Sequence, residues 1–163
     1  GSVVMSKPFI LGECRRTVDE RYRVTIPAEM VEQLDAGGDE CILAKEQSGA
    51  LSLWNAADWQ AKLDTGVRLV EEKMLAGRLD GRVEQVQMLG RLLSTRHTKV
   101  RLAGRGRLSV PEGFREFLGV EPGGEALVVG AAVCVELWRP ERWFTYIEEN
   151  IPQFRKLFDN LSA

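Results

Sequence analysis

Short runs of hydrophobic residues, separated by polar and glycine-containing turns, set the pattern of the first third of the chain. Residues 9–12 are apolar enough for a first strand, and the β-branched run 23–26 predicts a second strand. A proline opens the stretch 27–34, which predicts a short helix because proline suits the first helical position. The two glycines at 37 and 38 are expected to end this strand-turn-strand-helix unit.

A hairpin and two long helices are predicted next. Residues 41–44 form a continuous apolar run typical of a buried strand, and residues 51–54 alternate as a half-exposed strand. From residue 63 to 74, and again from 83 to 93, hydrophobic residues recur at helical spacing. We expect these helices to pack on the outside of the fold or against another subunit.

The chain contains an internal repeat with an offset of 84 residues. All four tryptophans fall into matched pairs, Trp54 with Trp138 and Trp59 with Trp143. The alignment needs no gap from residue 17 to 59, and other positions in it keep their character, as in Val24 with Leu108 and Met30 with Phe114. The repeat therefore predicts that the two halves have the same arrangement of strands and helices.

The second copy predicts a strand up to residue 102, a turn at 103–106, a strand up to 110 and a helix over 111–118. A hairpin over 126–138 and a helix from Pro140 complete it. After a break at Pro152, the chain ends in an apolar stripe made of Phe154, Leu157, Phe158 and Leu161. We interpret this stripe as a docking face, within the chain or between subunits.

Short strands and short helices in two copies predict an α+β fold with antiparallel strands. One copy alone would leave its strands at an open edge, where unpaired backbone groups invite association. A small β-barrel made jointly by both halves would bury these strands, with the long helices at its periphery. This pseudo-two-fold arrangement within one chain is the architecture that we predict.

The composition sets the limits within which a function has to be sought. The 163 residues are about one domain long, 44% are hydrophobic, and no apolar run approaches the ~18 residues of a membrane span. The net charge is −2 and the pI is near 5.6, so any contact with DNA requires a local basic patch. Gly1-Ser2 resembles an expression scar and Met5 the native start, and without a charged and apolar leader we expect a cytoplasmic protein.

Little in the sequence indicates catalysis or metal binding. Cys14, Cys41 and Cys134 lack the spacing of a zinc site or a disulfide framework and are expected to be buried free thiols. His97 is the only histidine, and neither a nucleophile motif nor a phosphate-binding loop accompanies it. We therefore expect no enzyme activity, no catalytic residue, no metal, no cofactor and no small-molecule substrate.

Basic residues instead gather around the two predicted turns. They are Arg15, Arg16, Arg21 and Arg23 in the first copy, and Arg96, Lys99, Arg101, Arg105 and Arg107 in the second. Guanidinium groups pair with phosphate oxygens and read guanine in the major groove, which admits a two-stranded β-ribbon. If the two turns lie side by side, these residues form a DNA-binding face. The alternative is that Arg23 and Arg107 are structural ion-pair partners of carboxylates such as Asp19.

A family resemblance joins these features. The stretches 11–13, 17–19 and 23–27, with 106–111 and 136–138 in the second half, closely resemble the MraZ family. The resemblance implies an AbrB-like swapped-hairpin β-barrel and a repressor of the bacterial division and cell-wall gene cluster. It also implies a ring of subunits that binds repeated boxes in promoter DNA, where several linked contacts add avidity.

The signature of this family is Asp-x-x-x-Arg in each half, regarded as its DNA-binding element. The resemblance thus implies DNA-binding roles for Asp19 and Arg23 in the first half, and for Arg107 in the second. This sequence departs from the pattern at Ala103, where the second aspartate is expected. The two turns therefore differ, and the second is predicted to contact mainly phosphate.

These observations predict a tail at 1–8, repeat halves at 9–59 and 96–148, a helical spacer at 60–95 and a terminal helix at 149–163. The leading hypothesis is a nucleoid-associated, sequence-specific transcriptional regulator that binds double-stranded DNA as a homo-oligomer. The alternative is an AbrB-like protein–protein module, an antitoxin or assembly scaffold, which the acidic pI and the apolar terminal stripe favour.

Overall fold

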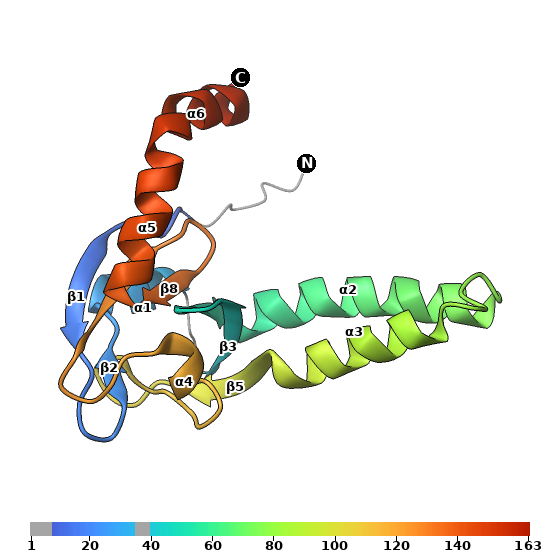
Figure 1. The fold of residues 1–163 in the computed structure, drawn as a ribbon, viewed down its shortest axis with the longest axis horizontal. Coiled ribbons are helices and arrows are strands. Elements are labelled where there is room, and N and C mark those ends of the chain that lie inside the picture. Colours follow the sequence, from blue (N-terminus) through green and yellow to red (C-terminus); the bar gives the residue numbers. More distant parts are fainter. Residues whose placement is uncertain (1–7, 35–39) are drawn as a thin grey trace.

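The computed structural model describes residues 8–34 and 40–163, and its main element is a six-stranded antiparallel sheet (Figure 1). The strand order in this sheet is β1-β7-β8-β4-β3-β5, and a separate antiparallel pair consists of β2 and β6. The strands are β1 (Glu13–Thr17), β2 (Arg23–Thr25), β3 (Glu40–Gln47), β4 (Ala50–Asn55), β5 (His97–Arg101), β6 (Arg107–Ser109), β7 (Glu125–Gly130) and β8 (Val135–Trp138). The helices are α1 (Ala28–Leu34), α2 (Ala56–Leu75), α3 (Val83–Thr95), α4 (Arg115–Leu118), α5 (Pro140–Asn150), the 3-10 turn η1 (Ile151–Gln153) and α6 (Phe154–Ser162).

Strands that lie 84 residues apart have equivalent partners. β1 pairs with β7 and β5 pairs with β3, so each half lends its first strand to the hairpin of the other half. β2 pairs with its own equivalent β6, and β4 with its equivalent β8. The predicted α+β class and antiparallel pairing are confirmed. The described strands do not close into a barrel, because β1 and β5 stand at opposite ends of the sheet order and β2 and β6 pair only with each other.

The hydrophobic core draws on both halves. One cluster includes Val24 and Leu53 from the first half and Leu108 and Leu137 from the second, all fully buried. A smaller cluster surrounds Trp138 at the start of α5. Because β4 lies in the middle of the sheet with both faces covered, it is buried almost throughout rather than half-exposed as the alternation suggested.

Two glycines explain where the predicted elements were wrong. The first strand is β1 and not residues 9–12, because Gly12 has φ +125° and interrupts the extended chain. In that stretch Ile10 alone forms a bridge, with Ala132. The helix expected from residue 111 begins only at Arg115, because Gly113 has φ +85° and cannot continue a right-handed helix.

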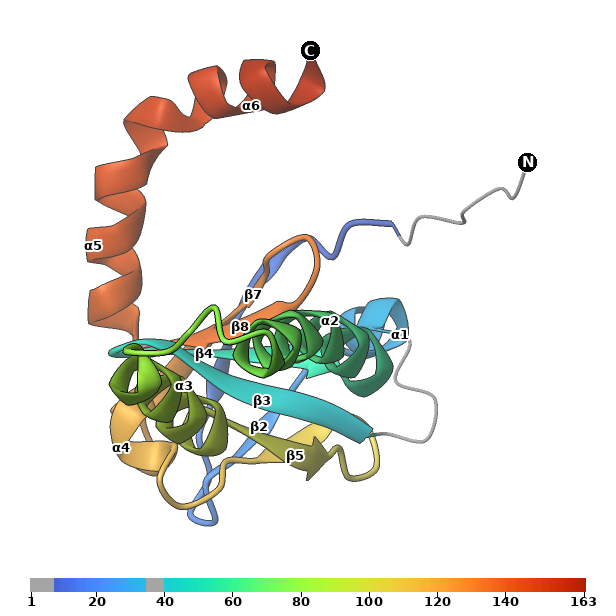
Figure 2. The same cartoon turned by 90° about the vertical axis from the view of Figure 1, so that its right-hand side faces the viewer.

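Two helical extensions leave the sheet in different directions. α2 and α3 run antiparallel as an arm that projects from the sheet, and no residue of either helix is buried (Figure 1). α5 rises from another edge of the sheet, and η1 turns the chain into α6 at the end of the molecule (Figure 2). In the described residues, no helix combines the length and the hydropathy that a membrane span requires.

Two of the predicted segments fall on residues that the structure does not describe. The predicted tail at 1–8, except for residue 8, lies outside the described residues. The two glycines at 37 and 38 also lie outside them. Cys14, Cys41 and Cys134 form no disulfide; Cys41 and Cys134 are buried as expected, but Cys14 is only half-buried. Burial raises the pKa of the Cys134 thiol to about 12, so this group stays protonated at neutral pH.

Candidate nucleic-acid interface

The short pair β2–β6 brings the two predicted turns together. Its register sets Arg23 opposite Ser109 and Thr25 opposite Arg107, with Val24 and Leu108 paired between them. These two apolar residues are completely buried, so the ribbon is anchored on the core by its centre. The arginines flank that anchor, and each is the first residue of its strand, directly after a turn.

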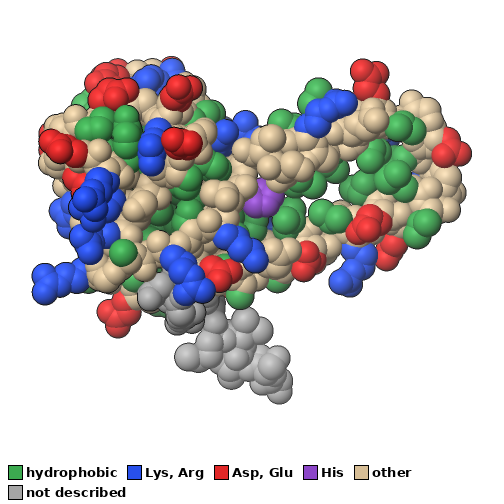
Figure 3. Space-filling view, turned by 90° about the horizontal axis from the view of Figure 1, so that it is seen from below, with side chains coloured by type: hydrophobic (Ala, Val, Ile, Leu, Met, Phe, Trp, Pro, Cys, Tyr) green, Lys and Arg blue, Asp and Glu red, His purple; other side chains and the backbone are tan. Residues whose placement is uncertain are grey.

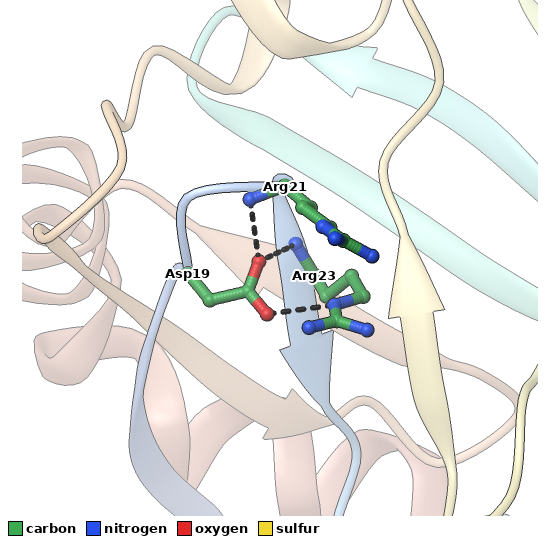
Figure 4. A network of polar contacts seen from close by, with 3 residues as sticks. All are labelled: Asp19, Arg21 and Arg23. Atoms are coloured by element: carbon green, nitrogen blue, oxygen red, sulfur yellow. Dashed lines mark hydrogen bonds and ion pairs between the residues drawn. The ribbon is translucent and has the colours of Figure 1, made fainter.

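A carboxylate organises the first turn (Figure 4). Asp19 Oδ1 accepts hydrogen bonds from the backbone N–H groups of Arg21 (2.8 Å) and Arg23 (2.9 Å). The second oxygen, Oδ2, accepts from the Nε of Arg23 at 2.7 Å, which is also an ion pair. The backbone bond from Arg23 N–H, outweighing partial burial, holds the pKa of Asp19 below its ordinary value of 3.8. The alternative of a structural ion pair is thus observed for Arg23.

Backbone geometry organises the second turn. Ala103 has no side-chain acceptor, and its carbonyl oxygen accepts instead from Gly106 N–H (3.0 Å) and Arg107 N–H (3.2 Å). Arg105 and Gly106 both have positive φ, 65° and 78°. A Cβ on Gly106 would stand 2.9 Å from the carbonyl oxygen of Ile26, so glycine is required at this close approach.

The two turns are also bonded to each other. Ile26 N–H donates to the Gly106 carbonyl (2.8 Å), and Val110 N–H donates to the Tyr22 carbonyl (2.9 Å). These two bonds are equivalent under the 84-residue offset, so they relate the turns by the same pseudo-two-fold. Tyr22 has φ 57°, and the Arg115 guanidinium lies over its ring at 4.4 Å. The relative position of the two turns is therefore fixed by the fold.

Three of the candidate arginines present their side chains to solvent. Arg21, Arg105 and Arg107 are exposed, and no ion pair holds their guanidinium groups among the described residues. Arg23 is half-buried, and its ion pair engages only Nε. In the view from below, Lys and Arg side chains lie among Asp and Glu side chains at the end of the molecule remote from the helical arm (Figure 3).

The candidates on β1 and β5 are already engaged with the protein. Arg15 pairs with Glu125 at 3.7 Å, while Arg16 Nε donates to the carbonyl of Thr25 on β2 at 3.2 Å. Lys99 and Arg101 share one carboxylate, that of Glu40, at 3.9 and 3.8 Å. These long pairs between exposed groups contribute little to stability and leave the side chains able to reorient.

Sequence reasoning grouped Arg96 with the turns, but this arginine belongs elsewhere. Its Nη2 donates to the carbonyls of Lys45 and Glu46, so it fixes the end of β3. Conversely, no role was assigned to Arg115, which supports Tyr22 and donates from Nε to the Val110 carbonyl at 2.8 Å. No sequence signal marks this contact, because it depends on the turns meeting in the fold.

The described residues offer no cluster of three or more His, Cys, Asp or Glu side chains that could hold a metal ion. His97 packs against Trp59, with ring centroids 5.5 Å apart. The arrangement can instead bind polyanions, because it presents exposed guanidinium groups on a rigid two-stranded support.

Comparison with known proteins finds similarity to a single named family. The MraZ family model, described as "MraZ protein, putative antitoxin-like", matches residues 94–161. The chain is 26% identical over 153 residues to the Transcriptional regulator MraZ of Syntrophomonas wolfei, covering 94% of this chain and 96% of that protein. The proteins of the same name from Heliobacterium modesticaldum (27% over 156 residues, 94% and 96% covered) and Thermus thermophilus (28% over 142 residues, 87% and 88% covered) are similar. The solved structure of PHS018 from Pyrococcus horikoshii has 13% identity and a TM-score of 0.32 over 80% of this chain and 90% of that one.

Proposed function

From this relationship to the MraZ family, which confirms the predicted resemblance, we propose that the chain is a sequence-specific DNA-binding transcriptional regulator. The relatives are regulators by name, in agreement with the prediction that the chain is not an enzyme. The observation that carries the proposal is the β2–β6 ribbon, which supports two arginine-bearing turns at a fixed distance from each other. A two-stranded ribbon of this kind fits the major groove of B-DNA.

We assign different tasks to the candidate residues. The exposed Arg21, Arg105 and Arg107 contact the DNA directly, and the last of these has a free guanidinium for base or phosphate. Asp19 holds Arg23 in place through Nε, which leaves the two terminal nitrogens of Arg23 without an ion pair among the described residues. Arg15, Arg16, Lys99 and Arg101 flank the ribbon and supply phosphate contacts, which position the protein without reading sequence.

The finer features implied by the resemblance belong to the same proposal. They are repression of a division and cell-wall gene cluster, binding of repeated promoter boxes by a homo-oligomeric ring, and a cytoplasmic, nucleoid-associated location. The exchange of first strands between the halves supports a duplicated swapped-hairpin origin of the fold. It also supports the proposed boundaries, with halves at 9–59 and 96–148, the spacer 60–95 between them and the terminal helix 149–163.

The decisive experiment measures binding to DNA from upstream of the protein's own gene, with a random duplex as control. We expect specific binding that weakens with salt by about 0.9 log unit of affinity per log unit of salt for each phosphate contact. Arg23→Ala should remove the preference for the specific duplex while the fold remains intact, and Arg107→Ala should weaken binding to both duplexes alike. Equal weak binding to both duplexes would reduce the site to a general electrostatic surface.

The second candidate function is a protein–protein module, such as an antitoxin or an assembly scaffold. The exposed apolar face of α6 favours it, because such a stripe is typical of a docking helix. Absence of any DNA binding at low salt, with the protein folded, would make this the better assignment. In that case the arginines of the turns would serve only to hold the turns.

A further inference from the structure

The first turn contains a strained residue directly before β2. Tyr22 has φ 57°, a left-handed conformation that is uncommon for any residue with a side chain and rarer still for a bulky one. Its equivalent under the 84-residue offset is Gly106, with φ 78°, and glycine adopts this conformation without a steric penalty. Strained residues of this kind persist only where surrounding contacts hold them, and they cluster at functional sites.

A side chain from the other half of the chain holds Tyr22. The guanidinium of Arg115, the first residue of α4, lies over the Tyr22 ring at 4.4 Å, which is a cation–π contact. Arg115 Nε also donates to the Val110 carbonyl at 2.8 Å, and Val110 N–H donates to the Tyr22 carbonyl at 2.9 Å. Residue 22 is therefore fixed through its side chain and its backbone together.

The second turn has no equivalent of this contact. The residue that corresponds to Arg115 is Val31, whose Cγ2 would stand 2.8 Å from a Cβ on Gly106. This pair of positions carries neither an aromatic ring nor a cation, and the glycine itself permits the left-handed conformation. The contact between Arg115 and Tyr22 thus belongs to the first turn alone, and the repeat does not explain it.

Residue 22 lies between the two arginines of the first turn. Arg21 comes directly before it and is exposed, while Arg23 comes directly after it and is held by Asp19 at 2.7 Å (Figure 4). The backbone angles of residue 22 set the direction of one arginine relative to the other. A contact that holds residue 22 therefore holds both arginines in one arrangement.

Arg115 is half-buried, and no ion pair holds it among the described residues. A guanidinium is planar and always charged, so it can stack on a ring and donate from Nε at the same time. We propose, on the basis of the function proposed above, that Arg115 is a positioning residue for DNA recognition. It holds Tyr22, and thereby sets Arg23 relative to Arg21, so that one arginine binds phosphate while the other reaches a base.

The test compares two arginines that make the same kinds of contact at different places. Arg115→Val introduces the residue type that the first half has at this position. Arg96→Val is the matched control, because Arg96 also donates to backbone carbonyls and lies over a ring, that of Phe117 at 5.7 Å, but it fixes the end of β3 and not a turn. Tyr22→Gly removes the ring and suits the positive φ, so it decides the question if Arg115→Val does not fold.

Affinity for the upstream duplex and for the random duplex is measured at several salt concentrations, and urea denaturation verifies the fold. We expect Arg115→Val and Tyr22→Gly to lower the preference for the upstream duplex by about tenfold, which corresponds to one base contact. The salt dependence should stay the same, because no phosphate contact is lost. Arg96→Val should keep the preference even where it loses stability. Tyr22→Phe should keep it too, since only the bond to Glu121 at 3.3 Å is removed.

The possible failures can be told apart. A wild-type protein that binds both duplexes equally would refute the proposed function, before any variant is compared. Given a wild-type preference, its retention in Arg115→Val and Tyr22→Gly would show that the contact only stabilises the fold. A salt slope lower by about 0.9 in Arg115→Val, with the preference retained, would make Arg115 a direct phosphate contact. Loss of the preference in Arg96→Val as well would attribute the effect to general destabilisation. Each of these three results would overturn the positioning role.

Discussion

The turn at residues 17–23 and the turn at residues 101–107 occupy equivalent places, yet different chemistry holds each of them. In the first, the carboxylate of Asp19 accepts two backbone N–H groups and the Nε of Arg23. In the second, the carbonyl of Ala103 accepts the N–H of Arg107, and two consecutive positive φ angles complete the turn. One turn is fixed by a charged side chain, and the other by a glycine.

This difference decides what each arginine is free to do. The carboxylate that shapes the first turn also holds Arg23, so that guanidinium is oriented before any ligand arrives. The second turn has no carboxylate at the equivalent position, and Arg107 remains exposed without an ion pair among the described residues. An oriented guanidinium loses less conformational freedom on binding, whereas a free one adapts to phosphates at different positions. We therefore expect the first turn to hold its arginine in one orientation toward DNA, and the second turn to let its arginine follow phosphates at different positions.

The largest expected effect concerns the glycine of the second turn. Gly106→Ala forces a Cβ to within 2.8 Å of Val31 and 2.9 Å of the Ile26 carbonyl, at a positive φ. We expect a loss of about 2–4 kcal/mol in the free energy of unfolding, from backbone strain and overpacking together. Urea denaturation measures it.

The control for this variant lies two residues earlier in the same turn. Gly104→Ala meets nothing within 4 Å, and Gly104 does not have positive φ. It should leave stability unchanged or raise it slightly, by up to about 1 kcal/mol. Equal losses in the two variants would show that glycine content, and not the close approach at 106, matters in this turn.

The first turn should respond to acid where the second does not. Because the pKa of Asp19 is lowered in the folded chain, its ionised form stabilises the fold at neutral pH. That contribution is present above the ordinary value of 3.8 and is lost as the pH falls through the lowered value. Asp19→Asn should therefore reduce the urea midpoint at pH 7, by less than Gly106→Ala, and the difference should vanish at low pH. The matched Ala103→Asn should give a difference from wild type that is the same at both pH values.

A second pair of equivalent positions extends the comparison to the centre of the sheet. Trp54 Nε1 donates to Ser52 Oγ at 2.8 Å, and Trp138 Nε1 donates to Glu136 Oε1 at 3.0 Å. Ser52 and Glu136 face each other across β4 and β8, and Ser52 is also hydrogen-bonded to Glu46. The second half therefore carries a half-buried carboxylate where the first half carries a hydroxyl.

Replacement of this carboxylate should stabilise the protein at neutral pH. Burial, together with the nearby Glu46, raises the pKa of Glu136, while the bond from Trp138 opposes the shift. For a raised carboxyl pKa, stability falls as the pH rises from the unfolded to the folded value and stays lower above it. Glu136→Gln keeps an acceptor for Trp138 and should raise the urea midpoint at pH 7 but not at pH 4. The exposed Glu148→Gln should have no such effect, and a loss of stability in Glu136→Gln at pH 7 would contradict this account.

Most of the elements could be predicted from the sequence, because local patterns determine them. The 84-residue repeat predicted the equivalent strands, and the helical spacing predicted both helices of the arm. The errors arose where single glycines with positive φ overrule the apolar pattern, at Gly12 and Gly113. The order of the strands could not be read locally, since the exchange of β1 and β5 between halves depends on contacts far apart in the chain.

The candidate site was predictable in composition but not in geometry. The residue types and the Asp-x-x-x-Arg spacing indicated Asp19 and Arg23, and the structure brings them into contact at 2.7 Å. Whether an arginine side chain forms an ion pair depends on which carboxylate the fold places beside it. Glu40 reaches Lys99 through the pairing of β3 with β5, and no sequence pattern contains that information.

The smallest effects on stability should come from the two equivalent arginines at the tips of the turns. Arg21→Ala and Arg105→Ala each remove an exposed side chain, so the free energy of unfolding should change by less than about 0.5 kcal/mol. If each contacts one phosphate, each variant should lower the slope of log affinity against log salt by about 0.9, equally for specific and random duplexes. A loss confined to the specific duplex in Arg21→Ala alone would show that the first turn reads bases with this residue. That outcome would show that the two turns contact DNA in different ways. Unchanged binding in both variants would instead show that Arg21 and Arg105 lie outside the interface, and that the strands β2 and β6 make the contacts.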